Sequence, residues 1–128
     1  MYKRDLELER KWEKLLEQLR VIVGKKPKDL NAVLFLIGVQ ELGRGKGFFS
    51  KEEKQDLMHI AICRVLSSSG YYSLIGLDEQ GWPHWKLEKK LPNFDLLEQE
   101  KLLKMHILEY FQEEYNWEFQ VNSNNGVN

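Results

Sequence analysis

The chain has 128 residues, and 19 basic against 20 acidic side chains leave a formal net charge of −1. This length suits one domain that needs neither a metal nor a disulfide for stability. The balanced charge provides no overall attraction for nucleic acid or acidic membranes, and a single cysteine excludes an internal disulfide framework. We therefore predict one helical domain over residues 1–121 and a disordered polar tail over residues 122–128.

The sequence carries no feature that predicts secretion or a membrane location. No charged start is followed by an apolar run and a cleavage site, so we expect a cytoplasmic protein. The longest strongly apolar run, residues 32–39, is far shorter than the roughly 20 residues that span a bilayer.

A first helix is predicted from residue 4 to residue 23, because apolar residues recur there at alternating steps of four and three. Its inward seam consists of Leu8, Trp12, Leu15, Leu19 and Ile22. Gly24 and Pro27 are typical of the chain break that follows.

A second helix is predicted over Leu30–Leu42, starting at Asp29 or Asn31 and ending at Gly43. It is apolar on nearly every side, which is typical of a helix enclosed by neighbours. Gly38 lies inside it, where glycine weakens a helix by up to about 1 kcal/mol, and this indicates close approach by another element.

A third helix is predicted to begin at Ser50, because Ser50 and Glu53 have the spacing of a capping box, and to run to about Ser68. The preceding Phe48 and Phe49 are interpreted as an apolar anchor on the core. The inward residues predicted for this helix are Leu57, Ile60, Ala61 and Val65.

A fourth helix is predicted between a cap formed by Asp95 with Glu98 and an end near Asn116. Its predicted inward residues are Leu96, Leu103, Ile107 and Tyr110. Beyond it, apolar residues alternate with polar ones at Trp117, Phe119 and Val121, a pattern that favours a third strand beside the hairpin described next.

A β-hairpin is predicted over residues 71–88, between the third and fourth helices. A loop over residues 78–81 ends on a glycine, which can adopt the left-handed conformation that closes longer hairpin loops. Leu77 then faces Trp82. The same register predicts four further cross-strand pairs, which are Gly76 with Pro83, Ile75 with His84, Leu74 with Trp85 and Tyr72 with Leu87. The fold class is therefore mainly α (α+β), a four-helix domain with one hairpin.

Side chains alternate between the two faces of this hairpin. One face is wholly apolar and is predicted to pack on the core; it consists of Tyr72, Leu74, Trp85 and Leu87. The other is too mixed for a core and unusually aromatic for a surface. We predict an interaction surface there, formed by Tyr71, Ile75, Leu77, Trp82 and His84, unless another part of the chain covers it.

These residues favour a small non-enzymatic protein-interaction or regulatory module. The ligand would be a protein partner or a second copy of the chain, as a homodimer. The first alternative is an enzyme or binding protein for a small phosphate-bearing ligand, because residues 43–47 combine glycines and cations ahead of a helix N-terminus. Its anion-binding residues would be Arg44, Lys46 and Ser50, although no Walker pattern is present.

The second alternative is DNA binding. The order of helix two, turn, helix three and aromatic hairpin resembles a winged helix-turn-helix with the hairpin as wing. The third helix would then read DNA, yet its opening turns carry Glu52, Glu53 and Asp56, which would face phosphates. Nucleic acid is therefore a disfavoured partner.

No metal, cofactor or catalytic residue is predicted. His59 and Cys63 share a helix face, and His84 or His106 could complete a zinc site, but no recognised ligand spacing accompanies them. Cys63 lies late in its helix, away from the N-terminal dipole that would activate a thiol, and we expect it to be buried and unreactive. The carboxylates are spread over solvated helix faces.

Three segments carry a resemblance to known proteins. They are DLNAVLFLIGVQELG from Asp29, FSKEEKQDLMHIAICRVL from Phe49 and GLDEQGWPHW from Gly76, together roughly half of the chain. The sequence resembles a family of small bacterial cytoplasmic proteins with no assigned function. The resemblance implies a bacterial, cytoplasmic setting and no particular activity.

Overall fold

The computed structural model describes residues 2–43 and 47–120. They form four helices and one hairpin, in the order α1 (Tyr2–Val23), α2 (Leu30–Leu42), α3 (Lys51–Ser67), β1 (Tyr72–Leu77), β2 (Pro83–Leu87) and α4 (Leu96–Tyr115). This confirms the predicted fold class, a mainly helical protein with a hairpin between the third and fourth helices.

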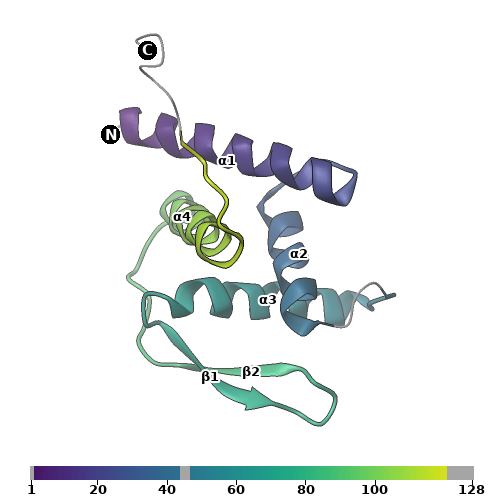
Figure 1. The fold of residues 1–128 in the computed structure, drawn as a ribbon. Helices are drawn as coiled ribbons and strands as arrows, with labels where there is room; N and C mark the ends of the chain where they lie inside the picture. Colours follow the sequence, from purple (N-terminus) through teal and green to yellow (C-terminus); the bar gives the residue numbers. More distant parts are fainter. Residues whose placement is uncertain (1, 44–46, 121–128) are drawn as a thin grey trace.

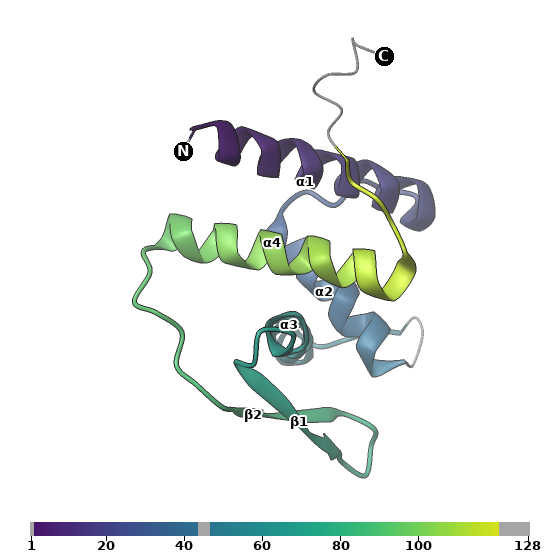
Figure 2. The ribbon, with the colours of Figure 1, turned by 60° about the vertical axis from the view of Figure 1, so that its left-hand side comes forward.

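The elements stack with α1 at one end of the molecule and the hairpin at the other (Figure 1). α1 packs on α4, and α3 lies beyond α4, next to both strands. The view turned by 60° shows the same order (Figure 2). α2 packs closely along α3, so α3 is in contact with α2, α4 and the hairpin.

The predicted helix starts are confirmed by their capping bonds. The Asp29 carboxylate accepts a hydrogen bond from the third backbone N–H of α2 at 2.9 Å. Reciprocal capping boxes begin α3, where Ser50 pairs with Glu53, and α4, where Asp95 pairs with Glu98. These are short-range signals, so the sequence locates them well.

The main core lies between α1, α2, α4 and the second half of α3. Its least exposed side chains include Leu15, Val33, Ile37, Ala61, Ile107 and Phe119. The predicted seam of α1 holds through Leu19 but is wrong at Ile22, which is 63% exposed. The whole last turn of α1, residues 21–23, is exposed.

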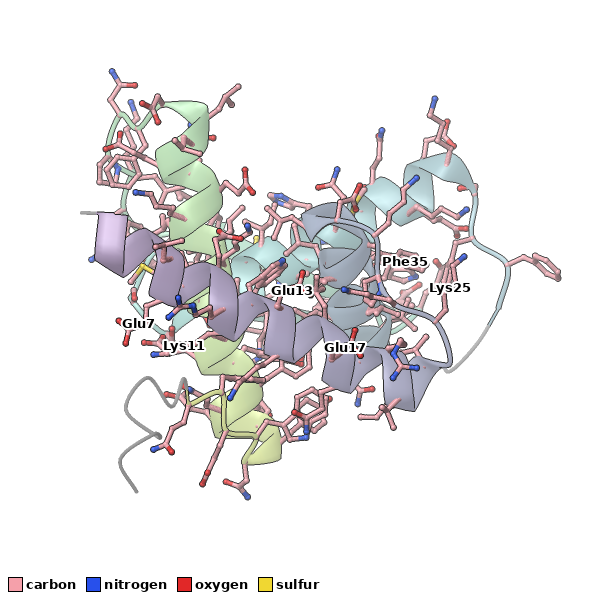
Figure 3. The ribbon with its side chains drawn as sticks, turned by 90° about the horizontal axis from the view of Figure 1, so that it is seen from above. Glu7, Lys11, Glu13, Glu17, Lys25 and Phe35 are labelled. Carbon is pink, nitrogen blue, oxygen red and sulfur yellow. The ribbon has the colours of Figure 1, made fainter. Side chains whose placement is uncertain are left out.

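Charged residues line the outward side of α1, among them Glu7, Lys11, Glu13 and Glu17 (Figure 3). Lys26, in the connection to α2, donates to Glu13 at 2.9 Å and lies 3.5 Å from the Glu17 carboxylate. These ion pairs join the exposed end of α1 to the chain that leaves it.

Two predicted inward residues are exposed instead. Phe48 is wholly exposed, and only Phe49 anchors the chain, edge-to-face against Phe35 with ring centroids 6.1 Å apart. Leu96 is 82% exposed because it is the first residue of α4, before the helix reaches its packing partners.

The C-terminal segment does not form the predicted third strand in the described residues, which contain one two-stranded sheet. α4 ends at Asn116, whose φ of 58° turns the chain. Phe119 then buries its side chain in the main core, and Lys14 of α1 donates to the carbonyl of Gln120. The alternating segment from Trp117 thus packs on helices rather than beside the hairpin. Val121 and the predicted tail lie outside the described residues.

The hairpin pairs Tyr72 with Leu87 and Leu74 with Trp85, as predicted. Nearer the loop the prediction is wrong by one residue. Leu77 pairs with Pro83, Gly76 pairs with His84, and Ile75 is left over in a β-bulge. The register changes because the loop is one residue shorter than expected. The Asp78 N–H donates to the Trp82 carbonyl at 2.9 Å, so only residues 79–81 form the loop.

Candidate functional site

The hairpin exposes four aliphatic side chains. Leu74 is 52% exposed, Ile75 69%, Leu77 66% and Leu87 51%. We call these four residues the hairpin aliphatic surface. The prediction that Leu74 and Leu87 pack inward is wrong, because α3 is a single helix and covers only part of the apolar face. Tyr72, by contrast, is half-buried against the core.

Two residues of the predicted interaction surface help to hold the hairpin in place. Tyr71 packs against the main core, and the ammonium of Lys89 lies 4.7 Å from its ring centroid. Trp82 packs on a second apolar cluster at the loop end, formed by Leu42, Leu57 and Ile60. Both aromatic residues are half-buried, so removing either ring would disturb the fold as well as any interface.

A cleft of about 540 Å³ lies between α3 and the loop end of the hairpin. From α3 it is lined by Glu53, Asp56, His59 and Ile60, and from the hairpin by Asp78, Gln80, Trp82, Pro83, His84 and Trp85. The lining includes three carboxylates and two tryptophans. No lysine or arginine of the described residues belongs to it, so the cleft is acidic and aromatic.

Asp78 organises the hairpin loop. One carboxylate oxygen accepts the backbone N–H groups of Gln80 and Trp82, both at 2.9 Å. The other lies 3.0 Å from the His84 ring nitrogen. The hydrogen bond with His84, followed by those from the backbone, lowers the pKa of Asp78 below its ordinary value of 3.8. His84 is therefore exposed but held by the loop.

His59 and Cys63 are neighbours, with the sulfur 3.5 Å from the imidazole Nε2. Cys63 is fully buried, and burial raises the pKa of its thiol to about 11, which agrees with the predicted unreactive cysteine. His106 lies elsewhere and accepts from the Ser69 hydroxyl at 2.7 Å while donating to the Leu102 carbonyl at 2.8 Å. Within residues 2–43 and 47–120, no three potential ligands gather as a metal requires.

The predicted anion site can be followed only at Ser50, because Arg44 and Lys46 lie outside the described residues. The Ser50 hydroxyl accepts the Glu53 backbone N–H at 3.1 Å, and the Ser50 N–H donates to the Glu53 carboxylate at 2.9 Å. The Glu53 carboxylate thus occupies the backbone N–H of Ser50, one of the donors that an anion would need.

The acidic cleft was not predicted. Its carboxylates are close in space because the hairpin folds back along α3, bringing Asp78 towards Glu53 and Asp56. The available signal was the acidic start of α3, which carries Glu52, Glu53 and Asp56. Trp85, assigned to the core-facing side, lines the same cleft.

Comparisons with protein-family models, curated proteins and solved structures find no match to this chain. Among the described helices, none has the length and apolar character of a membrane span. Function must therefore be argued from the surface features themselves.

Proposed function

We propose that this protein is a small non-enzymatic interaction module that binds a protein partner through the hairpin aliphatic surface. The observation that supports this most strongly is the exposure of four aliphatic residues on one short hairpin, each between 51% and 69%. Single exposed apolar residues are ordinary, whereas a concentration of them on one element is typical of binding surfaces.

The hairpin is well placed to present this surface without rearrangement. Tyr71 and Trp82 fix it to the two apolar clusters, and Asp78 ties its loop through three hydrogen bonds. A surface that is already ordered loses little conformational entropy when it binds. We therefore expect a partner to bind the hairpin in the conformation described, without a folding step on binding.

An extended segment is the form of partner that best suits the hairpin. The described sheet has only two strands, so β1 and β2 each have one outer edge without a neighbouring strand. Pro83 has no N–H to offer on β2, which makes β1 the better edge for an added strand. Such a strand would place alternate side chains near Leu74 and Leu77.

The proposal can be tested with a random peptide library displayed on phage, selected on the whole protein. Peptides that bind should lose about tenfold or more in affinity for Ile75→Asp and for Leu77→Asp, because a charge would have to be buried at the contact. Leu96→Asp is the control, since it places the same charge on another exposed leucine, outside the hairpin at the start of α4. Equal affinity for all four proteins would contradict the proposal.

A further inference from the structure

We infer that the protein has a second binding surface, at the end of α1, which docks on a membrane that contains anionic phospholipids. The surface consists of an exposed aliphatic tip, Val21, Ile22 and Val23, and of the lysines that follow it. It is separate from the hairpin aliphatic surface and does not depend on the proposed function.

The aliphatic tip is the first argument. Val21 is 72% exposed, Ile22 63% and Val23 48%, whereas Leu16 and Leu19 in the preceding turns are buried. Successive side chains lie about 100° apart around a helix, so these three residues point in different directions. A protein groove would cover one side of the tip. A lipid layer that the tip enters would surround all three side chains.

The charge around the tip is complementary to an anionic surface. Residues 20–28 contain four basic residues and no acidic one. Arg20 and Lys26 form ion pairs with carboxylates of α1, whereas Lys25 and Lys28 are exposed and pair with no other residue that the structure describes. A lysine beside the negative surface of such a membrane raises the affinity about fivefold. The balanced charge of the whole chain hides this local excess.

A second exposed apolar residue lies in a segment of the same kind. Phe48 is wholly exposed, while its neighbour Phe49 packs on Phe35. Residues 43–51 contain three basic residues and no acidic one. The described part of this segment, residues 47–50, leads into α3 on the side of the molecule where α1 ends (Figures 1 and 3). The two basic segments therefore hold seven of the 19 basic residues and none of the 20 acidic ones, which resume at Asp29 and Glu52.

The apolar residues favour a membrane over nucleic acid as the occupant. Binding to phosphates requires cations alone and gives exposed aliphatic side chains no role. An element that lies on a membrane uses both, because its apolar side chains enter the boundary of the acyl chains while its cations stay among the headgroups. α1 and the hairpin lie at opposite ends of the molecule (Figure 1), so docking through α1 leaves the hairpin aliphatic surface free for a protein partner.

Sedimentation of the whole protein with lipid vesicles tests the inference. Vesicles of phosphatidylcholine with about 30% phosphatidylserine should bind it at about 0.1 M salt, and vesicles of phosphatidylcholine alone should bind it at least about tenfold more weakly. Ile22→Asp should weaken binding to the anionic vesicles about tenfold or more, because a charge would have to enter the apolar layer. Lys25→Gln and Lys28→Gln should each weaken it about fivefold.

Three control variants should bind the vesicles as the wild type does. Leu96→Asp and Lys86→Gln make the same changes at exposed residues of α4 and β2. Leu77→Asp alters the hairpin aliphatic surface, which the vesicles do not need. Urea unfolding checks that Ile22→Asp stays folded, and the lysine variants, which change only exposed side chains, test the surface independently of that check.

The outcomes separate this inference from the proposed function. Equal binding to both kinds of vesicle, or equal binding by the wild type, Ile22→Asp and the lysine variants, would show that the inference is wrong and leave the proposed function standing. Loss of vesicle binding in Leu77→Asp but not in Ile22→Asp would place the lipid contact on the hairpin and contradict both. Binding to duplex DNA that the lysine variants lose, without binding to vesicles, would assign the basic segments to nucleic acid and overturn the inference.

Discussion

Gly38, in the middle of α2, lies directly against the backbone of Leu57 in α3. A Cβ atom placed on Gly38 would be 2.7 Å from the Leu57 carbonyl carbon and 2.9 Å from its Cβ, and closer still to the carbonyl oxygen. The two helices therefore meet at a point where only glycine fits. This confirms the close approach that the sequence predicts, and it fixes α3, and with it the hairpin, relative to α2.

Gly38→Ala should destabilise the protein by about 1–3 kcal/mol, because the obstructing atoms belong to the backbone and the helices must move apart. Urea unfolding measures this as a lower midpoint. Gly47→Ala is the control, since a Cβ there would meet no atom within 4 Å. Equal midpoints for the two variants would show that α2 and α3 do not pack as described.

The centre of α2 should be equally sensitive to the loss of side-chain volume. Leu34 and Ile37 are 2% and 1% exposed, so Leu34→Ala or Ile37→Ala should cost about 2–5 kcal/mol. Ile22→Ala, at a side chain that is 63% exposed, should change stability little. Thermal or urea unfolding compares the three, and an Ile22 effect as large as the others would contradict the assignment of the core.

Tyr110 joins α4 to α2 through its hydroxyl, which donates to the Glu41 carboxylate at 2.7 Å. Burial, and then this bond, raise the pKa of Tyr110 above its ordinary value of 10.0. The raised folded-state pKa means that the contribution is present below pH 10 and is lost as the pH rises further. Tyr110→Phe should cost about 1 kcal/mol at neutral pH, and the difference from wild type should shrink above pH 10. A difference that grows at high pH would contradict this.

Asp78 should give the hairpin loop an acid-sensitive element. Its lowered pKa means that the ionised form is favoured in the folded state, so the stabilisation is present above pH 3.8 and fades as the pH falls through the lower folded value. An NMR titration of the carboxyl carbon should give a midpoint below 3.8, and His84→Ala should raise it. A midpoint at or above 3.8 in the wild type would show that the loop is not tied by Asp78.

The parts of the fold that depend on neighbouring residues could be predicted from the sequence. The capping boxes at Ser50 and Asp95 involve residues three apart, and the left-handed Gly43 ends α2 as expected. The exposure of residues such as Leu74 could not be predicted, because it depends on which distant element covers the hairpin. The alternating segment at Trp117 is a clear example, since its pattern is real but its packing partners are helices.

Part of the candidate site could likewise be predicted from neighbouring residues, and part depends on distant elements of the chain. Ile75 and Leu77 could be assigned to a surface from strand alternation alone, and both are exposed. The cleft could not be assigned, because it requires Asp56 of α3 and Asp78 of the hairpin to come together across a turn. The bulge at Ile75 also escaped prediction, since it results from a loop one residue shorter than the sequence pattern suggests.

Methyl NMR of the whole protein with a selected peptide tests the central claim most directly. The methyl groups of Leu74, Ile75, Leu77 and Leu87 should show the largest shifts on binding, while those of Leu96 and Leu97, which are also exposed at the start of α4, should not move. The largest shifts at α4 or at the exposed end of α1, with the hairpin methyl groups unchanged, would contradict the assignment of the hairpin as the binding surface.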